Sequence, residues 1–509
     1  MATYSRPGVF IQEVALPQSV VVPDNGTAVG AFAGALAKGS AAAPVLVSGW
    51  TEFVKTFGGI EDAYPTTWAA YNFFANGGRN LYVQRVLGSG ADFGTVTITD
   101  GGDPASNAFT ITAASAGAWS SSYGVKVIAA GGASRFGLVV YGAPTIYGNA
   151  TSNPVEQFTD LSMDPTDRNY VLSVVNASST YIRISGVDSE VTPATGGSVI
   201  ALSGGADGSA PERADYQDAW VLFDPIDNPL VVYNPDAAYA STSELSSELA
   251  GDAVNYASSR TDAFAVVDTP SGMTVSEAKT QVADIKAIYA ATSTGNNVAA
   301  YYPWFYIPDT TKASGTLRLQ APGAAAVGQY LATDASRGVF KTPAGYNNRI
   351  ALAVASEHQF TNDELDDINT STSPINAIRQ VPGNGLVIMG GRTMDNTPTN
   401  RYINIRRSLI YIEKELTQRS AFAVFENNDE RLWLSLRTTL TNFLRTYWQA
   451  GGLRGASPAQ AFYVKCDSTT TSFADIQNGQ VNIEVGVALQ YPTEFVVIKL
   501  GQLTGNATV

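Results

Sequence analysis

The clearest hydrophobic pattern of the chain lies in residues 429–452, DERLWLSLRTTLTNFLRTYWQAGG. Apolar residues recur there every three or four positions, which at about 100° per residue places them on one face of a helix. Acidic residues at the start of the segment suit the positive end of a helix dipole, and two glycines at its end favour termination. The pattern therefore predicts an amphipathic helix with one apolar stripe. The stripe consists of Leu432, Trp433, Leu436, Leu440, Phe443, Leu444 and Tyr447.

Three extended runs follow this helix, at residues 461–467, 480–488 and 494–500. The second run alternates between apolar and polar residues, which is typical of a strand with one buried face. Its apolar positions are Val481, Ile483, Val485 and Val487, and its polar or small positions are Asn482, Glu484 and Gly486. The C-terminal region is thus predicted to combine helices and strands.

Apolar strands alternate with helical patterns in two other regions, residues 25–90 and 209–366. This alternation predicts parallel strands joined by right-handed crossovers, in one α/β domain built from both regions. The predicted strands are 26–39, 80–86, 260–270 and 297–309, and the predicted helices are 50–59, 67–78 and 275–291.

Residues 91–208 differ from both flanking regions, because short alternating runs rich in Thr, Ser and Gly replace the longer periods. They predict an inserted all-β domain, whose one helix-length pattern lies around residues 154–161. Gly204, Gly205 and Gly208 are expected to form a tight turn at its exit. The fold class is therefore an α+β multidomain protein, with an N-terminal arm (1–24), an α/β middle domain (25–90 plus 209–366), the insert, and an α/β C-terminal domain (367–509) that ends in arm strands (480–500).

Charge and composition narrow the function further. The 509 residues carry a net charge of −14, which argues against a general nucleic-acid binder, because phosphates are neutralised by Lys and Arg. Residues 401–454 are the exception, with nine basic and five acidic residues. One cysteine excludes an intramolecular disulfide and fits a reducing cytoplasm. Neither a signal peptide nor an apolar run long enough to insert into a membrane is found.

Candidate catalytic groups are few. Asp268 and Asp309 stand at strand ends, where an α/β enzyme places its acids, and the single histidine, His358, lies near several acids. Thr361 and Glu364, however, have the spacing of a helix capping box, which explains that acidic segment without catalysis. Phosphate-binding loops and a nucleophile elbow are both missing. We expect no catalytic residue, cofactor or metal, although a carboxylate pair brought together by the fold, or a β-rich adhesin, stays an alternative.

Several sequence words in the last hundred residues resemble the C-terminal domain of contractile-tail sheath proteins. They are RYINIRRSLIYIEKEL (401–416), AVFENNDERLW (423–433), GGLRGASPAQAFYVKCD (451–467), DIQNGQVNIEVGVA (475–488) and PTEFVVIKL (492–500). The resemblance implies a non-enzymatic subunit that forms hexameric rings, stacked helically around an inner tail tube, and that contracts to drive the tube through a cell envelope. The implied partners are further copies of the chain, the tube protein, and baseplate and tail terminator proteins. It further implies a location in a tail sheath assembled in the host cytoplasm, of a phage, a bacteriocin particle or another injection system.

The same resemblance extends to the first residues, MATYSRPGVFIQEV, and implies that both chain ends are arms that add strands to neighbouring subunits. A terminal strand that joins its own domain is the alternative for residues 1–14. The expected arm residues are Val9, Phe10, Ile11, Val14, Val481, Ile483, Val485, Val487, Phe495 and Val497. Because the C-terminal domain would lie inward, Arg406, Arg407, Arg431, Arg437 and Arg445 are candidates for facing an acidic tube, and a solvated helix face is the alternative.

Overall fold

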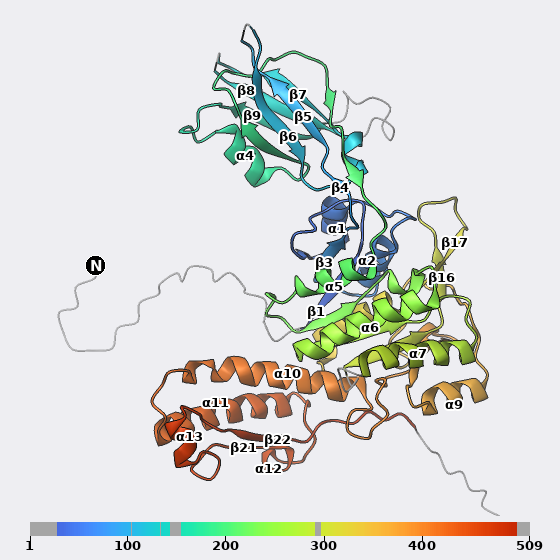
Figure 1. Ribbon diagram of the computed structural model, residues 1–509. Helices are drawn as coiled ribbons and strands as arrows, with labels where there is room; N and C mark the ends of the chain where they lie inside the picture. Colours follow the sequence, from blue (N-terminus) through green and yellow to red (C-terminus); the bar gives the residue numbers. More distant parts are fainter. Residues whose placement is uncertain (1–27, 103, 133, 143–153, 291–296, 496–509) are drawn as a thin grey trace, which may run out of the picture.

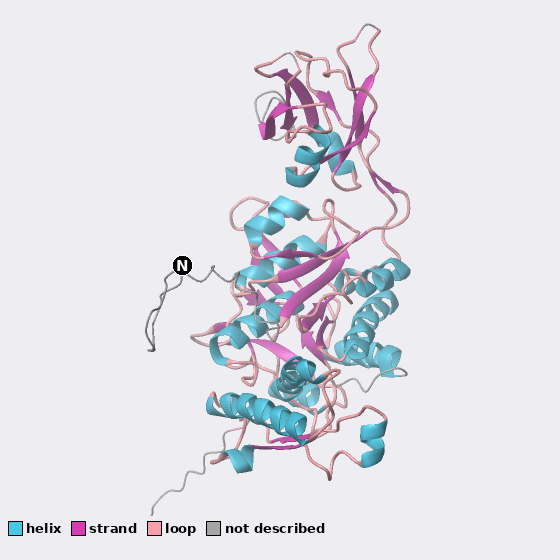
Figure 2. Ribbon diagram, turned by 90° about the vertical axis from the view of Figure 1, so that its left-hand side faces the viewer, coloured by secondary structure: helices cyan, strands magenta, loops and turns pink. Residues whose placement is uncertain are grey.

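The computed structural model describes residues 28–102, 104–132, 134–142, 154–290 and 297–495. These residues form three parts arranged along one long axis, as both ribbon views show (Figures 1 and 2). The insert lies at one end, a central α/β part in the middle, and a C-terminal part with two long helices at the other end. We use the names insert, central part and C-terminal part for them below.

An eight-stranded sheet, here called the central sheet, organises the central part, in the strand order β2-β3-β1-β13-β14-β15-β19-β20. Pairing is parallel from β3 through β1, β13, β14 and β15 to β19, so the predicted parallel sheet is confirmed. β2 and β20 pair antiparallel at the two edges. The strands are β1 (Val29–Ala35), β2 (Val45–Val47), β3 (Leu81–Val86), β13 (Leu230–Tyr233), β14 (Ala263–Asp268), β15 (Val298–Tyr302), β19 (Ile375–Val381) and β20 (Gly385–Ile388).

The central sheet corrects one predicted boundary. β19 and β20 fall in residues 367–509, which the sequence assigned to the C-terminal domain, yet β19 pairs with β15 of the central sheet. The apolar residues of β19 complete the cores on both sides of that sheet. The central part therefore extends to about the end of β20.

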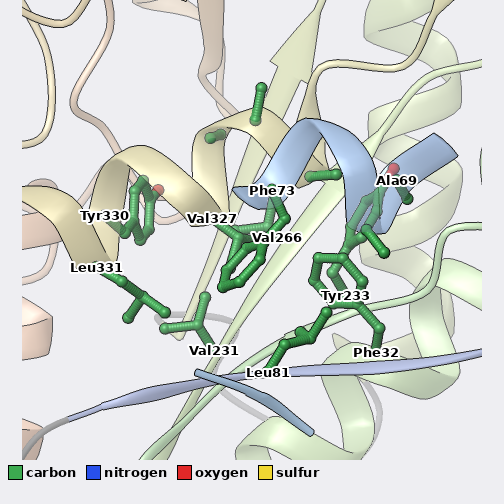
Figure 3. Close-up of a cluster of buried hydrophobic side chains, with 14 of the residues drawn as sticks. Phe32, Ala69, Phe73, Leu81, Val231, Tyr233, Val266, Val327, Tyr330 and Leu331 are labelled. Atoms are coloured by element: carbon green, nitrogen blue, oxygen red, sulfur yellow. The ribbon is translucent and has the colours of Figure 1, made fainter. Parts of the chain in front are cut away.

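Helices cover both faces of the central sheet, because successive strand residues point to opposite sides. Phe32 and Tyr233 belong to one core, with residues of α1, α2 and α8, and their neighbours Ala31 and Val232 belong to the other, with residues of α5, α6, α7 and α9. Figure 3 shows the first core, where Phe73 of α2 and Val327 of α8 meet the strands. The helices are α1 (Trp50–Phe57), α2 (Pro65–Ala75), α5 (Arg213–Val221), α6 (Ser243–Arg260), α7 (Val275–Ala290), α8 (Gly323–Arg337) and α9 (Asn362–Thr370).

The predicted strand 297–309 is in fact two strands in two sheets. β15 ends at Tyr302, and β16 (Phe305–Pro308) pairs with β17 (Leu317–Gln320) and β18 (Ala355–Ser356) instead. Pro303 lies between them, and proline has no N–H to continue a hydrogen-bonded ladder. The uninterrupted apolar run concealed this change of sheet.

The insert consists of a three-stranded sheet, β10-β6-β5, and a four-stranded sheet, β11-β7-β8-β9, around one core. Among the described residues of the insert, α4 (Val171–Ser178) is an α-helix with Val171 and Val175 buried, whereas residues 154–161, the expected helical site, form strand β9 against β8. Ladder hydrogen bonds to β8 outweighed a weak helical period there. The strands are β5 (Thr95–Thr99), β6 (Asn107–Ala113), β7 (Gly124–Ala129), β8 (Phe136–Tyr141), β9 (Pro154–Leu161), β10 (Ile182–Val187) and β11 (Ile200–Ala201).

A two-stranded ribbon connects the insert to the central part, formed by β4 (Ala91–Asp92) and β12 (Ala206–Asp207). Gly208 follows at φ +78°, and a Cβ there would lie 2.6 Å from the backbone nitrogen of Ala91, so the expected tight turn needs glycine. Arg85 of β3 reinforces the junction, since its guanidinium donates hydrogen bonds to the carbonyl oxygens of Leu36 and Ala116, at 2.6 Å each.

The C-terminal part is built around two long helices, α10 (Ile403–Ser420) and α11 (Glu430–Gln449). The buried residues of α11 are the seven of the predicted stripe, and the Asp429 side chain accepts hydrogen bonds from the first turn, so this prediction is confirmed. Two short helices, α12 (Pro458–Ala461) and α13 (Phe473–Gln477), and strands β21 (Phe462–Lys465) and β22 (Glu484–Val487) complete it. Among the described residues, none of the helices could cross a membrane.

Candidate assembly interface

A small antiparallel sheet, β21–β22, lies against α11 in the C-terminal part (Figure 1). Its register pairs Phe462 with Val487 and Lys465 with Glu484. Within the described ranges each of its strands has a β partner on one side only, so both outer edges present backbone N–H and C=O groups. Such edges are templates for the addition of further strands.

The buried face of this sheet belongs to the core of the C-terminal part. Val485 and Val487 pack against the cluster that includes Phe443 and Leu444 of α11. Val481 and Ile483, just before β22, pack against a second cluster around Trp433.

These contacts bear on four of the expected arm residues. Val485 and Val487 in β22, and Val481 and Ile483 just before it, are partly buried against their own chain, and their role as arm residues stays a prediction. Phe495 is 69% exposed. The other expected arm residues, Val9, Phe10, Ile11, Val14 and Val497, lie outside the described residues.

The opposite face of the small sheet is polar, and on it the ring of Tyr463 lies close to the backbone of Gly486. A Cβ at Gly486 would lie 2.1 Å from the ring of Tyr463 on the paired strand. The Tyr463 hydroxyl donates a 2.6 Å hydrogen bond to Glu484. Gly486 thus lets the tyrosine ring lie across its partner strand.

The solvent face of α11 is basic. Arg431 and Arg445 are exposed on it, and among the described residues neither has an ion-pair partner. Arg437 is half-buried at the side of the helix. Hydrogen bonds from Thr469, and after them the charges of Lys465 and then Arg437, hold the pKa of Asp467 below its ordinary value against the opposing effect of burial. Two of the five expected tube-facing arginines therefore form a free positive face.

Arg406 and Arg407 have structural roles, which corrects their assignment as tube-facing residues. The Arg407 side chain is 3% exposed, and its Nη1 donates a 3.0 Å hydrogen bond to Asp334 of α8. The guanidinium also lies 4.8 Å from the ring centre of Tyr330. Arg406 donates to the side chain of Asn297. Both arginines tie α10 to the central part.

Residues 395–500 match the family model of the phage tail sheath C-terminal domain. The predicted resemblance to tail sheath proteins is confirmed. No curated protein matches the chain in sequence. The sheath-like match spans α11, the small sheet and the basic face, which are the features described above.

Solved sheath structures share the fold over nearly the whole chain. The sheath of PVC, an extracellular contractile injection system, in the contracted state is 20% identical, with 99% of each chain covered and a TM-score of 0.52. The contracted helical sheath of the anti-feeding prophage is 19% identical, covers 98% of this chain and 100% of its own, and has a TM-score of 0.57. A sheath tail protein from Listeria innocua is 13% identical, with 91% and 95% covered and a TM-score of 0.60.

The carboxyl edge of the central sheet, where an α/β enzyme would place its acids, is occupied by internal bonds in this sheath-like chain. Asp268 accepts hydrogen bonds from the Tyr233 hydroxyl (2.7 Å) and the Gly323 backbone (2.9 Å). Asp236 likewise accepts from Ala35, Thr66 and Tyr216. Burial raises the pKa of Asp268 to about 7, against the smaller opposing effect of its hydrogen bonds. These bonds join strands to helices and give both acids a structural role.

The other candidate catalytic groups also have local partners. Asp309 accepts from the backbone and hydroxyl of Thr311, at 2.9 and 2.6 Å. His358 lies 3.3 Å from Glu364, and Thr361 and Glu364 form the predicted capping box of α9, which is confirmed. Over the part of the chain that the structure describes, no group of three His, Cys, Asp or Glu side chains could hold a metal ion.

Proposed function

We propose that the chain is the structural subunit of a contractile sheath, which polymerises as stacked hexameric rings around an inner tube and shortens to drive the tube through a cell envelope. The similarity in fold to two contracted sheaths over 98% or more of the chain is the observation that carries this proposal. In the assembled particle, the insert and the central part face outward and the C-terminal part faces the tube. The proposed domains have the boundaries predicted from the sequence, except that β19 and β20 belong to the central part.

Subunits are held together in this proposal by strands exchanged between neighbours. The free edges of β21 and β22 receive the N-terminal arm, with Val9, Phe10, Ile11 and Val14, and the C-terminal arm, with Phe495 and Val497, of adjacent copies. Each backbone hydrogen bond of an added strand contributes about 1 kcal/mol. The binding free energy of a single arm therefore exceeds the entropic cost of ordering its residues by little or nothing. Assembly is therefore cooperative, and bent arms keep neighbours connected while subunits rotate.

The tube contact is electrostatic in this proposal. Arg431 and Arg445 on the solvent face of α11 attract an acidic tube surface in the extended state. Exposed charge pairs contribute at most about 1 kcal/mol each and are screened by salt, so many such contacts can hold the sheath and still release together. Contraction then uses energy stored at assembly, as in other metastable switches, without nucleotide hydrolysis.

Electron microscopy of the purified chain tests the proposal, beside a variant that lacks residues 1–14. Tubes or stacked rings from the full chain, and monomers or single rings from the truncated one, are expected. A full chain that stays monomeric at high concentration, and also when the tube protein is supplied, would contradict the proposed self-assembly. A phage tail, a bacteriocin particle and another injection system fit these observations equally well.

A further inference from the structure

One arginine holds the last described residues of the chain to the central sheet. The Arg392 guanidinium donates two parallel hydrogen bonds to the carboxylate of Glu494, at 2.8 Å from Nε to Oε1 and 2.6 Å from Nη2 to Oε2. Asn369 at the end of α9 (3.3 Å) and the Tyr402 hydroxyl (3.1 Å) also donate to Glu494. The Arg392 and Glu494 side chains are only 9% and 22% exposed. Paired charge-assisted bonds of this kind fix both distance and orientation.

Arg392 is in turn fixed to the central sheet through its backbone. Its N–H donates to the Asn376 side chain of β19 at 2.8 Å, and the amide of Asn376 donates back to the Arg392 carbonyl at 2.8 Å. The same Asn376 amide donates to Ala300 of β15 at 3.1 Å. A Cβ at Gly390 would lie 2.6 Å from Asn376 Oδ1, so glycine lets the loop pass this close. A continuous series of hydrogen bonds thus joins Glu494 to two strands.

The segment that contains Glu494 passes from the C-terminal part to the central part. After β22, Leu489 pairs with Leu453 of the C-terminal part, and the Asn404 side chain donates to the Gln490 carbonyl at 2.8 Å. The segment then crosses to the central part, where Glu494 is bound. Phe495, directly after it, is 69% exposed. Glu494 is therefore the last side chain with internal partners before the described chain ends.

The pair is ionised at neutral pH. Burial by itself would raise the pKa of Glu494, but hydrogen bonds from Arg392, its charge, and bonds from Asn369 and Tyr402 outweigh burial and hold the pKa below its ordinary value. Removal of one partner of such a pair leaves the other charge uncompensated in a site of low exposure, which costs more than the loss of an exposed pair.

We propose that Arg392 and Glu494 anchor the root of the C-terminal arm, so that the arm leaves from the central sheet and not from β22. Arg392 is a positioning residue: it sets the direction in which the arm reaches a neighbour, and it transfers the pull of that neighbour to the largest rigid unit of the chain. This inference rests on the proposed exchange of arms and adds the residues that fix its geometry.

Substitution of Glu494 by Gln tests the anchor, because it removes the charge and keeps the size of the side chain. Asp262→Asn is the matched control, since the Arg260–Asp262 pair has similar exposures of 9% and 18%, and Asp262 pairs with Arg260 and Lys414 and not with the segment that carries Glu494. Both variants are compared with the parent in three measurements. These are the melting temperature of the unassembled protein, the protein concentration needed for assembly, and the spin-label distance distribution between Phe495→Cys and Asp218→Cys in a Cys466→Ala background.

The anchor predicts that Glu494→Gln broadens the distance distribution and raises the concentration needed for assembly by about tenfold or more, as expected for loss of a charged bidentate contact. Its melting temperature should match that of Asp262→Asn, which leaves the other two measurements unchanged. An unchanged distance distribution in Glu494→Gln overturns the anchor, whether or not the protein assembles. A parent chain that never assembles overturns the proposed function instead, and a variant without residues 496–509 that assembles normally overturns the role of the arm.

Discussion

The buried ion pair between α8 and α10 offers the sharpest test of how the central and C-terminal parts are joined. Asp334 and Arg407 have side-chain exposures of 8% and 3%, and the guanidinium also lies over the ring of Tyr330. Asp334→Asn removes one charge of the pair with little change of shape. Arg407 would then stay charged and buried, since its guanidinium does not lose its proton at accessible pH.

The expected cost follows from this geometry. Removal of one partner of a buried pair costs about 3 to 5 kcal/mol, because the other charge is left without compensation. A cavity of about 250 Å³ borders both side chains, and water entering it would solvate the orphaned guanidinium in part. We therefore expect about 3 kcal/mol, at the lower end of that range.

Hydrogen exchange is the suitable assay, because a chain with several separate cores does not unfold in one two-state step. The free energy of opening, read from the amides of α10 in the unassembled protein, should fall by about 3 kcal/mol in Asp334→Asn. Amides of the insert should be unaffected.

Two controls make the result decisive. Asp367→Asn breaks the exposed pair with Lys279, whose side chains are 53% and 31% exposed, and should cost no more than about 1 kcal/mol. The double variant Asp334→Leu with Arg407→Met removes both charges and should lie within about 2 kcal/mol of the parent. If Asp334→Asn costs no more than Asp367→Asn, the pair does not join the two parts and the reasoning is wrong.

Three further predictions concern other parts of the molecule. Reversal of Arg431 and Arg445 to Glu should abolish assembly on the tube at low salt and leave self-assembly intact, and normal co-sedimentation with the tube would exclude the basic face as the contact. Leu444→Ala should lower the opening free energy of α11 by about 2 to 5 kcal/mol, whereas Leu434→Ala, on the exposed side, should change it by less than about 0.5 kcal/mol in the same exchange experiment. Since burial raises the pKa of Asp268 to about 7, above its unfolded value, the folded state binds the extra proton, and the stability of the central part should fall as the pH rises from about 4 to about 7; this slope should disappear in Asp268→Asn, as measured by denaturation over that range.

The sequence was a good guide wherever one local period decided the structure. The stripe of α11 and the capping box of Thr361 and Glu364 were predicted residue by residue, since both depend on spacing along a single helix. The parallel central sheet followed from the alternation of strands and helices.

Long-range contacts limited the rest of the prediction. Arg407 and Asp334 are 73 residues apart, so the sequence could not show that this arginine is buried, whereas Arg431 and Arg445 lie opposite a recognisable apolar stripe. Similarly, Glu494 and Arg392 are 102 residues apart, and nothing local indicates that they meet. β19 was misassigned because its partner, β15, precedes it by more than seventy residues.

The ribbon of β4 and β12 has a consequence for engineering and for divergence between related chains. Because Ala91 and Asp207 face each other in register, the insert starts and ends at one point, and a foreign domain whose termini lie close together could replace it without displacing a strand of the central sheet. A sheath-like particle built from such chimaeras would display that domain at every subunit. The same geometry would let natural sequences exchange or lose the insert while the central sheet is retained.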